Sequence, residues 1–461
     1  MDAQLHSRYN PEAEAVRYID SLNLNASTEC FILIKPGLGY MIPVLQERFK
    51  HSRIISLHAE NFSSQEDALK FLESEVPEEM SRISIIEWRP SLEFYKERYV
   101  NLLSAAVEFL KRKDAETRTL AAFGKRWIRN FFKNLAILDN VILYRKSEIP
   151  VIITGSGPSL EQALPIIRMM QNNCLIIASS SSVLSLAHAG IKPDIITAYD
   201  GGSWALKHIY PFFREKEDSF LAVNLCAALP SQCAGVPKLI INDGSFWQSI
   251  VLHELSLPSV IITQKGTVTA VSTELAMLLS TGNIYIAGMD LSVSDIRSHT
   301  KPYAFDYLFF EAANRFEPAY NKNYIRSSLI KQGGSMDIYA AWFKNQKKIW
   351  PNRIYSLTES NLTTNKDLTT SIFNEADLSE FLQDKIKNQK DKVIKNCFST
   401  AKVSQDMSLI KKKALNILLS AIKDQKYSQN LKNELTALLF PGEKNIETQE
   451  IENTLCGIVN E

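Results

Sequence analysis

The segment 151–167, "VIITGSGPSLEQALPII", joins a run of aliphatic residues to a helix-like stretch through the turn "GSGPSL". Gly155 and Gly157 can adopt backbone angles that other residues avoid, and they let the chain approach a ligand closely. Pro158 suits the first turn of a helix, where its missing N–H group carries no penalty. Ser159 and the free N–H groups of that turn would face an anion, helped by the helix dipole. The turn therefore predicts a phosphate-binding loop, and the alternative is a plain helix cap after a buried strand.

Two common nucleotide-binding loops do not fit this turn. No GK[ST] follows, as a P-loop requires, and Leu160 stands where the motif GxGxxG has its third glycine. No acidic residue ends the next predicted strand. A P-loop ATPase and a dinucleotide enzyme are therefore both disfavoured.

Polar residues recur at the ends of the next two predicted strands. The second strand ends in "ASSSS", which carries the hydroxyls of Ser179, Ser180 and Ser181. The third strand runs into "AYDGG", which places Asp200 and two glycines at its tip. In an open parallel sheet, ligands bind beyond the carboxyl ends of the strands. Three polar tips on strands expected to be neighbours favour one nucleotide-sized pocket over three unrelated turns.

The segment 264–306 holds the candidate for acid–base chemistry. Its strand "NIYIAGMD" ends at Asp290, and the loop beyond contains His299 and Tyr303. A neutral histidine with a pKa of about 6.5 could deprotonate an acceptor hydroxyl, and Tyr303 could donate a hydrogen bond to a departing phosphate. The alternative for His299 is a solvated loop side chain. Four other histidines fall in or near predicted elements and are expected to be structural: His58, His188, His208 and His253.

The elements that must position these residues alternate between apolar runs and helix-like segments from 150 to 357. The candidate strands are 151–155, 174–179, 194–200, 219–225, 238–243, 259–263 and 283–290. This alternation predicts a doubly wound parallel sheet of the Rossmann type. A shorter alternation from Cys30 to about Pro90 predicts a smaller α/β domain, in which the turn "GLGY" is interpreted as structural.

We therefore expect an α/β protein in three parts. Residues 1–140 would form an N-terminal α/β domain with a helical connector, and 141–360 a central Rossmann-like domain. Amphipathic segments predict a C-terminal helical domain over 361–461.

The composition of the whole chain narrows the class of protein. The 461 residues include 52 Lys+Arg and 51 Asp+Glu, a net charge of +1, which gives no electrostatic footprint for nucleic acid. The N-terminus shows no secretion signal, and no apolar run approaches the ~20 residues that span a bilayer. The six scattered cysteines fit neither a zinc site nor a CxxC redox motif and predict reduced thiols. These features predict a cytoplasmic protein with no transmembrane segment and no nucleic-acid partner.

Several motifs together resemble those of a known family. The stretches "GSGPSL", "ASSSS…LAHAGIKPDIITAYD" and "NIYIAGMDLSVSDIRSHT" look like the motility-associated factor (Maf) family of flagellin glycosyltransferases. The central domain of that family is MptE-like, shared with the archaeal 6-hydroxymethylpterin pyrophosphokinase. It is also similar to bacterial sialyltransferases that use a CMP-activated nonulosonic acid. The stretches "YNPEAEAVRYI…GLGY" and "NLAIL" extend the resemblance into the N-terminal region.

The resemblance implies a site around the strand ends. It places the 155–159 turn against a donor nucleotide, with polar residues of the neighbouring tips completing the pocket, and Tyr303 beside the leaving phosphate. The nucleotide-binding residues that it implies are Gly155, Ser156, Gly157, Pro158, Ser159, Ser179, Ser180, Ser181, Asp200, Thr267 and Thr269.

This sequence departs from the sialyltransferase pattern at the catalytic base. The stretch downstream of "YAFD", which reads "YIRSSLIKQGGSMDIYAAWF", has no histidine. Either His299 serves as the base, or Asp290 does, or the mechanism differs.

The sequence also departs from the pterin pyrophosphokinases. Those enzymes carry acidic residues at the second and third strand tips, as expected for binding Mg²⁺ and a triphosphate, whereas "ASSSS" and "ITAYD" retain one carboxylate. Hydroxyls without a carboxylate cluster suit a CMP-sugar, which has a single phosphate. A divalent ion on Asp200 and Asp290 is left open, and no other cofactor is expected.

The function that these observations favour is transfer of a nonulosonic acid, of the pseudaminic or legionaminic type, from a CMP donor to serine or threonine hydroxyls of flagellin. The expected catalytic residues are His299, Tyr303 and Asp290. Two alternatives stay open: an ATP- and Mg²⁺-dependent pyrophosphokinase acting on a pterin, and a non-catalytic nucleotide-binding motility protein.

Overall fold

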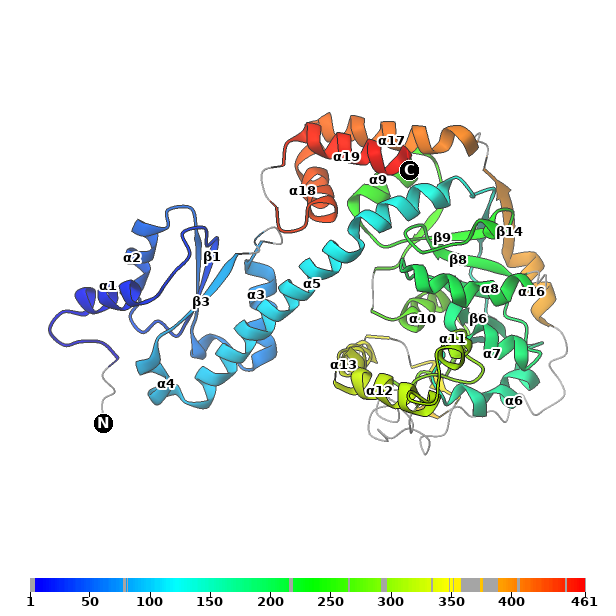
Figure 1. The fold of residues 1–461 in the computed structure, drawn as a ribbon, viewed down its shortest axis with the longest axis horizontal. Helices are drawn as coiled ribbons and strands as arrows, with labels where there is room; N and C mark the ends of the chain where they lie inside the picture. Colours follow the sequence, from blue (N-terminus) through cyan, green and yellow to red (C-terminus); the bar gives the residue numbers. More distant parts are fainter. Residues whose placement is uncertain are drawn as a thin grey trace. The chain divides into compact units, whose positions relative to one another are not determined.

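The chain folds into two compact units, each with its own sheet and hydrophobic core (Figure 1). Unit 1 comprises Met1–Gly124 and Asn433–Glu447, and unit 2 comprises Lys125–Lys432 and Thr448–Glu461. The computed structural model describes residues 5–77, 80, 82–214, 219–263, 266–291, 297–332, 335–347, 349–350, 352–357, 374–375, 389–403, 407–443 and 446–460.

Unit 1 is built around three parallel strands in the order β2–β1–β3. Its strands are β1 (Cys30–Ile34), β2 (Arg53–Leu57) and β3 (Ile83–Glu87). Its helical elements are α1 (Pro11–Ser21), α2 (Met41–Arg48), the 3₁₀ turn η1 (Ala59–Asn61), α3 (Gln65–Glu75), α4 (Arg89–Tyr95) and the first part of α5 (Glu97–Leu135).

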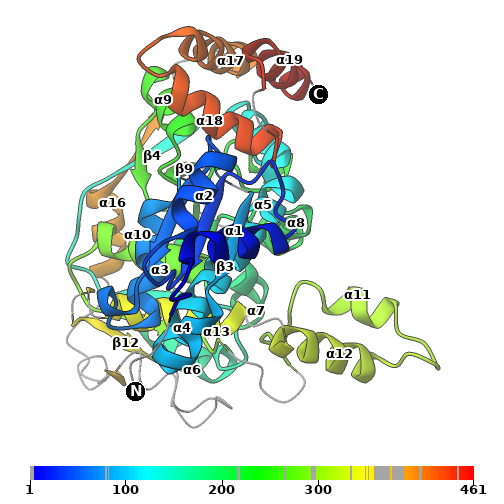
Figure 2. The same ribbon diagram turned by 90° about the vertical axis from the view of Figure 1, so that its left-hand side faces the viewer.

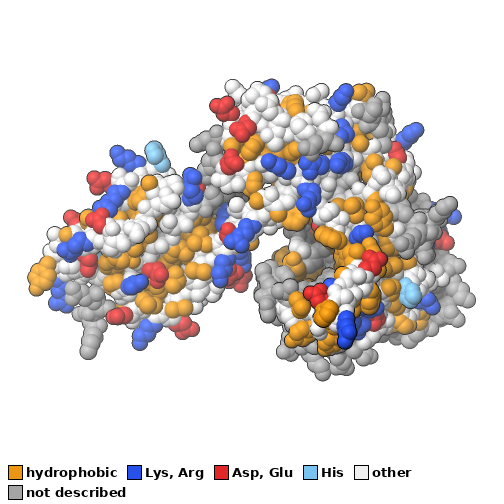
Figure 3. All heavy atoms as spheres, in the orientation of Figure 1, with side chains coloured by type: hydrophobic (Ala, Val, Ile, Leu, Met, Phe, Trp, Pro, Cys, Tyr) orange, Lys and Arg blue, Asp and Glu red, His pale blue; other side chains and the backbone are white. Residues whose placement is uncertain are grey.

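Helices cover both faces of this small sheet. Phe31 and Leu33 of β1 face α1 and α2, whereas Ile32 and Ile34 face α3 and α5. A strand that is covered on both faces has no polar side to present, and this explains why "CFILI" is apolar throughout. On the face of unit 1 seen in Figure 3, acidic and basic side chains are interspersed.

Unit 2 contains a larger sheet in the order β13–β12–β11–β5–β6–β7–β8–β9–β4–β14, with β10 also paired to β9. Its strands are β4 (Asn140–Tyr144), β5 (Val151–Thr154), β6 (Leu175–Ser179), β7 (Ile195–Ala198), β8 (Phe220–Asn224), β9 (Lys238–Asn242), β10 (Ser259–Ile261), β11 (Ile284–Ala287), β12 (Ile354–Ser356), β13 (Asn374–Glu375) and β14 (Phe398–Lys402). All the described pairings are parallel except that of β14 with β4. The predicted α/β fold with a doubly wound sheet is confirmed.

Helices pack on this sheet and extend beyond it. They are α6 (Leu160–Met170), η2 (Ser180–Ser182), α7 (Val183–His188), η3 (Ser203–Ala205), α8 (Leu206–Arg214), η4 (Ser231–Cys233), α9 (Phe246–Glu254), α10 (Val268–Leu279), α11 (Asp306–Glu311), α12 (Ala319–Gln332), α13 (Ser335–Lys347), α16 (Gln389–Cys397), α17 (Met407–Lys423), α18 (Ser428–Leu439) and α19 (Thr448–Asn460). Apolar side chains of α10 join those of β5, β6 and β11 in the main core, and α11 and α12 pack side by side (Figure 2).

The C-terminal region is not purely helical. The predicted helix over 378–398 lies partly outside the described residues, and its described part is α16. Directly after α16, β14 pairs antiparallel with β4 and closes that edge of the sheet. Neither β4 nor β14 is predicted from the sequence, because the residues that pair with each strand lie far away along the chain.

The order of the strands defines where a ligand is expected. From β5 the chain adds β6, β7, β8 and β9 in one direction, and β11 then pairs on the other side of β5. Ligands of open α/β sheets bind in the crevice outside the carboxyl ends of the strands at such a reversal. The carboxyl ends of β5 and β11 are therefore the place to examine. Among the described residues, no helix is long and apolar enough to cross a membrane.

Candidate functional site

Two glycines bring the ends of β5 and β11 into direct backbone contact. The N–H of Gly155 donates to the carbonyl oxygen of Ala287 at 2.8 Å. A Cβ atom on Gly155 would lie 2.4 Å from the carbonyl oxygen of Gly288, and one on Gly288 would lie 2.5 Å from that of Gly155. Gly288 also has a φ of +68°, which side-chain-bearing residues rarely adopt. Backbone packing alone therefore requires glycine at both positions.

Asp290 occupies the N-terminus of α6. Its Oδ2 accepts a hydrogen bond from the N–H of Ser159 at 2.8 Å. The side chain is 5% exposed, and burial raises the pKa of its carboxyl. A Cβ atom on Gly157 would lie 2.3 Å from the same Oδ2. The anion at this helix end is thus a side chain of the protein itself, so a donor phosphate would have to bind next to Asp290 and not in its place.

Three buried polar atoms around this turn have no hydrogen-bond partner among the described residues. They are Ser159 Oγ, Asp290 Oδ1 and Thr300 Oγ1. Thr300 belongs to the turn because its N–H donates to the carbonyl oxygen of Ser156 at 2.8 Å. Buried polar groups in folded proteins are nearly always hydrogen-bonded to protein or water. These atoms therefore indicate a polar spot at which the two hydroxyls could donate to ligand oxygen atoms and Asp290 Oδ1 could accept from a ligand hydroxyl.

The loop 297–303 is fastened to the first turn of α6. Glu161 accepts from Arg297 Nη1 at 2.9 Å and from the N–H of Lys301 at 2.9 Å. On the other side, Ser185 Oγ of α7 donates to the carbonyl oxygen of Pro302 at 2.8 Å. These contacts bring the predicted histidine loop beside the predicted glycine turn.

His299 and Tyr303 lie together in that loop. Their rings stack with centroids 4.1 Å apart and planes inclined by 16°. Tyr303 is 6% exposed, and its hydroxyl lies 3.4 Å from Nε2 of His208 on α8. Phe305 packs edge-on against Tyr303 and His208. The site therefore contains two imidazoles and a phenol in one aromatic cluster.

His208 is not among the residues predicted from the sequence, where its place in a helical segment indicates a structural histidine. One signal could have identified it. The helix α8 begins just after the tip of β7, so a histidine in its first turn must lie near the carboxyl ends of the strands. The structure places His208 against Tyr303 and thereby adds a second candidate base.

Hydroxyls of two further elements lie against the glycine turn. Ser179 Oγ is 3.4 Å from Thr269 Oγ1, and a Cβ atom on Gly155 would lie 3.0 Å from that same Oγ1. Thr267 caps α10, since its Oγ1 accepts from the N–H of Ala270 at 3.1 Å. The structure thus brings Ser179 and Thr269 to the turn, and it uses Thr267 to start the helix.

The serine run after β6 forms the short turn η2. Ser180 is buried and Ser181 is half-buried, and neither hydroxyl makes a side-chain hydrogen bond among the described residues. Ser182 instead links the strands, with its Oγ 2.8 Å from Thr154 Oγ1 and donating to the carbonyl oxygen of Ser179 at 2.8 Å.

Asp200 stabilises the turn in which it lies. Its Oδ1 accepts from the N–H of Gly202 at 2.7 Å, and its side chain is exposed. A Cβ atom on Gly201 would lie 2.4 Å from Trp127 of α5, and Asn130 Nδ2 donates to the carbonyl oxygen of Gly201 at 3.1 Å. No hydrogen bond or ion pair within the described part of the chain joins Asp200 to the 155–159 turn.

Comparisons with known proteins agree with this architecture. Residues 125–295 match the family model described as 6-hydroxymethylpterin diphosphokinase MptE-like. An uncharacterized protein from Treponema pallidum (strain Nichols) is 25% identical over 292 residues, covering 60% of this chain and 61% of its own length. The chain thus spans about three fifths of the length of that relative.

A solved structure extends the likeness to the whole chain. The MAf glycosyltransferase from Magnetospirillum magneticum AMB-1 has a similar fold with a TM-score of 0.51 and 14% identity, covering 100% of this chain and 80% of the other. The resemblance is therefore confirmed for an MptE-like central region and for a fold like that of a MAf glycosyltransferase.

Proposed function

We propose that this protein is a glycosyltransferase that moves a nonulosonic acid, of the pseudaminic or legionaminic type, from a CMP donor to serine or threonine hydroxyls of flagellin. The observation that carries the proposal is the stack of His299 on Tyr303 beside the 155–161 turn. The similar fold of a protein described as a MAf glycosyltransferase supports it.

The aromatic cluster contains the groups that such a transfer needs. The acceptor hydroxyl would give its proton to the imidazole of His299 while its oxygen attacks the anomeric carbon of the sugar. The bond between that carbon and the phosphate oxygen breaks, and the electron pair leaves with CMP. The Tyr303 hydroxyl would donate a hydrogen bond to the departing phosphate, whose developing charge it stabilises. His208 would orient this phenol from the other side.

The donor would bind around the glycine turn. Because Asp290 already occupies the end of α6, the phosphate would take its hydrogen bonds from Ser159 Oγ, Thr300 Oγ1 and Tyr303. The other proposed contacts to the nucleotide come from the 155–158 backbone and from the side chains of Ser179, Ser180, Ser181, Asp200, Thr267 and Thr269.

A second candidate function is an ATP- and Mg²⁺-dependent diphosphokinase, which the description of the matching family model favours. Against it stands the small number of carboxylates at these strand ends, since each of the two already uses one oxygen within the protein. Asp290 holds the N–H of Ser159, and Asp200 holds the N–H of Gly202. A donor with one phosphate needs less cationic charge than a triphosphate, so these contacts favour the CMP-sugar.

Calorimetric titration with CMP and then with ATP plus Mg²⁺ would test the proposal. A bulky side chain at Gly157 would displace Asp290 and damage the turn, so the binding variant is Ser156→Trp, with Ser231→Trp on the exposed η4 as its control. We expect CMP to bind the wild type and the control, and not Ser156→Trp. Binding of ATP·Mg²⁺ alone would favour the diphosphokinase, and binding of neither ligand would favour a non-catalytic protein.

A further inference from the structure

Unit 1 carries a glycine turn of its own after its central strand. The segment "KPGLGY" joins β1 to α2, with φ values of +64° at Gly37 and +80° at Gly39. An acidic residue, Glu60 in η1, stands three residues after the end of the next strand, β2. A glycine pair after the first strand and an acid after the second are two parts of the fingerprint with which α/β sheets bind a nucleotide. The glycine turn keeps its structural interpretation, because His6 occupies it, and the candidate ligand contact is the acid.

The structure brings Glu60 to the base of this glycine turn. Lys35, the residue directly after β1, is 4% exposed, and its Nζ forms an ion pair with Glu60 Oε2. The hydrogen bond from Lys35 lowers the pKa of Glu60, which is therefore ionised at neutral pH. His58 Nδ1 lies 3.9 Å from Oε1, beyond hydrogen-bond distance, and the Glu60 side chain is 58% exposed. One oxygen of the carboxylate is thus available to accept from a ligand hydroxyl.

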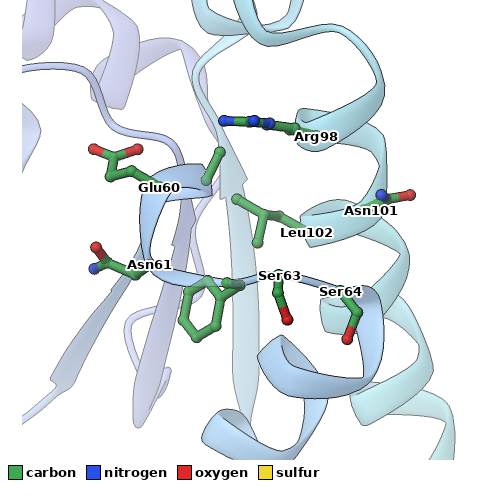
Figure 4. A pocket seen from close by; sticks show the side chains of 9 residues that line it. Glu60, Asn61, Ser63, Ser64, Arg98, Asn101 and Leu102 are labelled. Atoms are coloured by element: carbon green, nitrogen blue, oxygen red, sulfur yellow. The ribbon is translucent and has the colours of Figure 1, made fainter.

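A cavity of about 380 Å³ opens beside Glu60 (Figure 4). Its apolar lining comes from Ala59 and Leu102, which are buried, and from Phe62, which is half-buried. Arg98 extends from α5 toward the segment that carries Glu60 (Figure 4), and it makes no ion pair among the described residues. Ligand sites of this size combine an apolar lining with a few polar groups. The apolar lining suits a heterocyclic base, and the carboxylate of Glu60 suits the hydroxyls of a sugar.

The N-terminal segment limits what this site can hold. His6 Nε2 accepts a hydrogen bond from the N–H of Leu38 at 2.9 Å, inside the glycine turn. A Cβ atom on Gly37 would lie 2.2 Å from that nitrogen, and the imidazole stacks on Trp88 with centroids 5.0 Å apart. A pyrophosphate on the turn would need this space and this N–H group. The ligand should therefore be a nucleoside that does not extend over the turn.

We propose that unit 1 binds a nucleoside in the cavity next to Glu60. The 2′ and 3′ hydroxyls of its ribose donate to Glu60 Oε1, and its base lies against Phe62 and Leu102 with Arg98 over the opening. This site is distinct from the one proposed for the CMP-sugar, because all its residues belong to unit 1.

Equilibrium titration of the full-length protein with adenosine, guanosine, cytidine and uridine tests the proposal. We expect at least one of them to bind, and its 2′,3′-dideoxy analogue to bind at least tenfold more weakly. The variant Glu60→Gln should show a similar loss, whereas Glu66→Gln on the exposed start of α3 should bind as the wild type does. Arg98→Ala provides a second variant that leaves the ion pair with Lys35 intact, and it should also bind more weakly. Equal binding of the dideoxy analogue, or no nucleoside binding at all, would overturn the proposal.

The variant Ser156→Trp separates this site from the one in unit 2. If the nucleoside binds in unit 1, this variant keeps that affinity even where it loses CMP. If Ser156→Trp removes the nucleoside while Glu60→Gln does not, the ligand belongs to unit 2 and the present proposal is wrong.

Discussion

The imidazole of His299 lies flat against the phenol ring of Tyr303, with centroids 4.1 Å apart and planes inclined by 16°. Thr300 and Lys301, which lie between these two residues in the sequence, hold the loop in place. Their N–H groups donate hydrogen bonds to Ser156 of the glycine turn and to Glu161 of α6. A proton acceptor and a hydrogen-bond donor are thereby held beside the carboxyl ends of β5 and β11. The relationship gives the proposed transfer a defined geometry, from which the first prediction follows.

Replacing His299 with alanine should lower the rate of sugar transfer from a CMP donor by about 10²–10⁴-fold, because the acceptor hydroxyl loses its general base. Donor affinity should change little, so the loss should fall on the maximal rate. His253→Ala, at an exposed position on α9, is the control and should retain full activity. Full activity of His299→Ala together with an inactive His208→Ala would assign the base to His208 instead.

Gly288→Ala should destabilise unit 2 by about 2–6 kcal/mol, the sum of about 1–3 kcal/mol for steric overlap and about 1–3 kcal/mol for a strained backbone angle. Its Cβ atom would lie 2.5 Å from the carbonyl oxygen of Gly155, at a φ of +68°. Gly235→Ala is a matched control, because its φ is +80° and no atom lies within 4 Å of its Cβ position. Gly235→Ala should lower the free energy of unfolding, measured with denaturant, by about 1 kcal/mol. Equal losses of stability in the two variants would refute the close packing of β5 and β11.

Because of Asp290, the protein should lose stability as the pH rises above the ordinary pKa of a carboxyl group. Burial raises the pKa of this carboxyl above its ordinary value, so the folded state resists ionisation. The unfolding free energy should therefore fall as the pH rises from the ordinary carboxyl pKa to the raised one.

Asp290→Asn keeps an oxygen that can accept from the N–H of Ser159 and carries no charge. It should be more stable than the wild type at pH 7, and the difference should shrink as the pH falls through the raised pKa toward the ordinary carboxyl value of about 4. Denaturant unfolding at a series of pH values measures this, with Asp391→Asn at an exposed position of α16 as the control. A variant less stable than the wild type at pH 7 would show that the charge on Asp290 is needed.

Because of Lys238, the free energy of unfolding should also depend on pH in the alkaline range. Its side chain is fully buried and donates to the carbonyl oxygens of Ile137, Cys233 and Val236. Burial lowers the pKa of this ammonium group from 10.5 to about 8. The folded state then favours the neutral amine. Below pH 8 the charge on Lys238 therefore has its full destabilising effect on the folded state. This effect decreases as the pH rises from about 8 to 10.5.

Between about pH 8 and pH 10.5, the free energy of unfolding of the wild type should rise by about 3 kcal/mol relative to that of Lys238→Met, since one pKa unit corresponds to about 1.4 kcal/mol. The quantity to measure is the difference between the two proteins at each pH, because tyrosines and cysteines titrate in both. A constant difference from pH 8 to pH 10.5 would contradict the lowered pKa.

Local sequence was sufficient for the elements around the site. The run "VIIT" and its neighbours "LIIAS" and "IITA" are buried at every position and largely aliphatic, because both faces of the sheet are covered. The alternation of such runs with helix-like segments implies parallel strands with crossovers, and the glycines and serines after the runs mark the strand ends. The doubly wound sheet and the end at which to look for a ligand could therefore be predicted.

Tertiary structure alone decided which of these ends meet. Hydrophobic periodicity reports that a strand is buried and not which strand lies beside it, so the pairing of β11 with β5 and the contact of Gly155 with Gly288 could not be predicted. The same is true of Asp290 at the end of α6 and of His208 at Tyr303, since each joins residues from distant parts of the chain. Local sequence determined the elements and the kinds of residue at their ends, because these depend on near neighbours. The packing of the whole unit determined the site, because it depends on contacts between residues far apart in sequence.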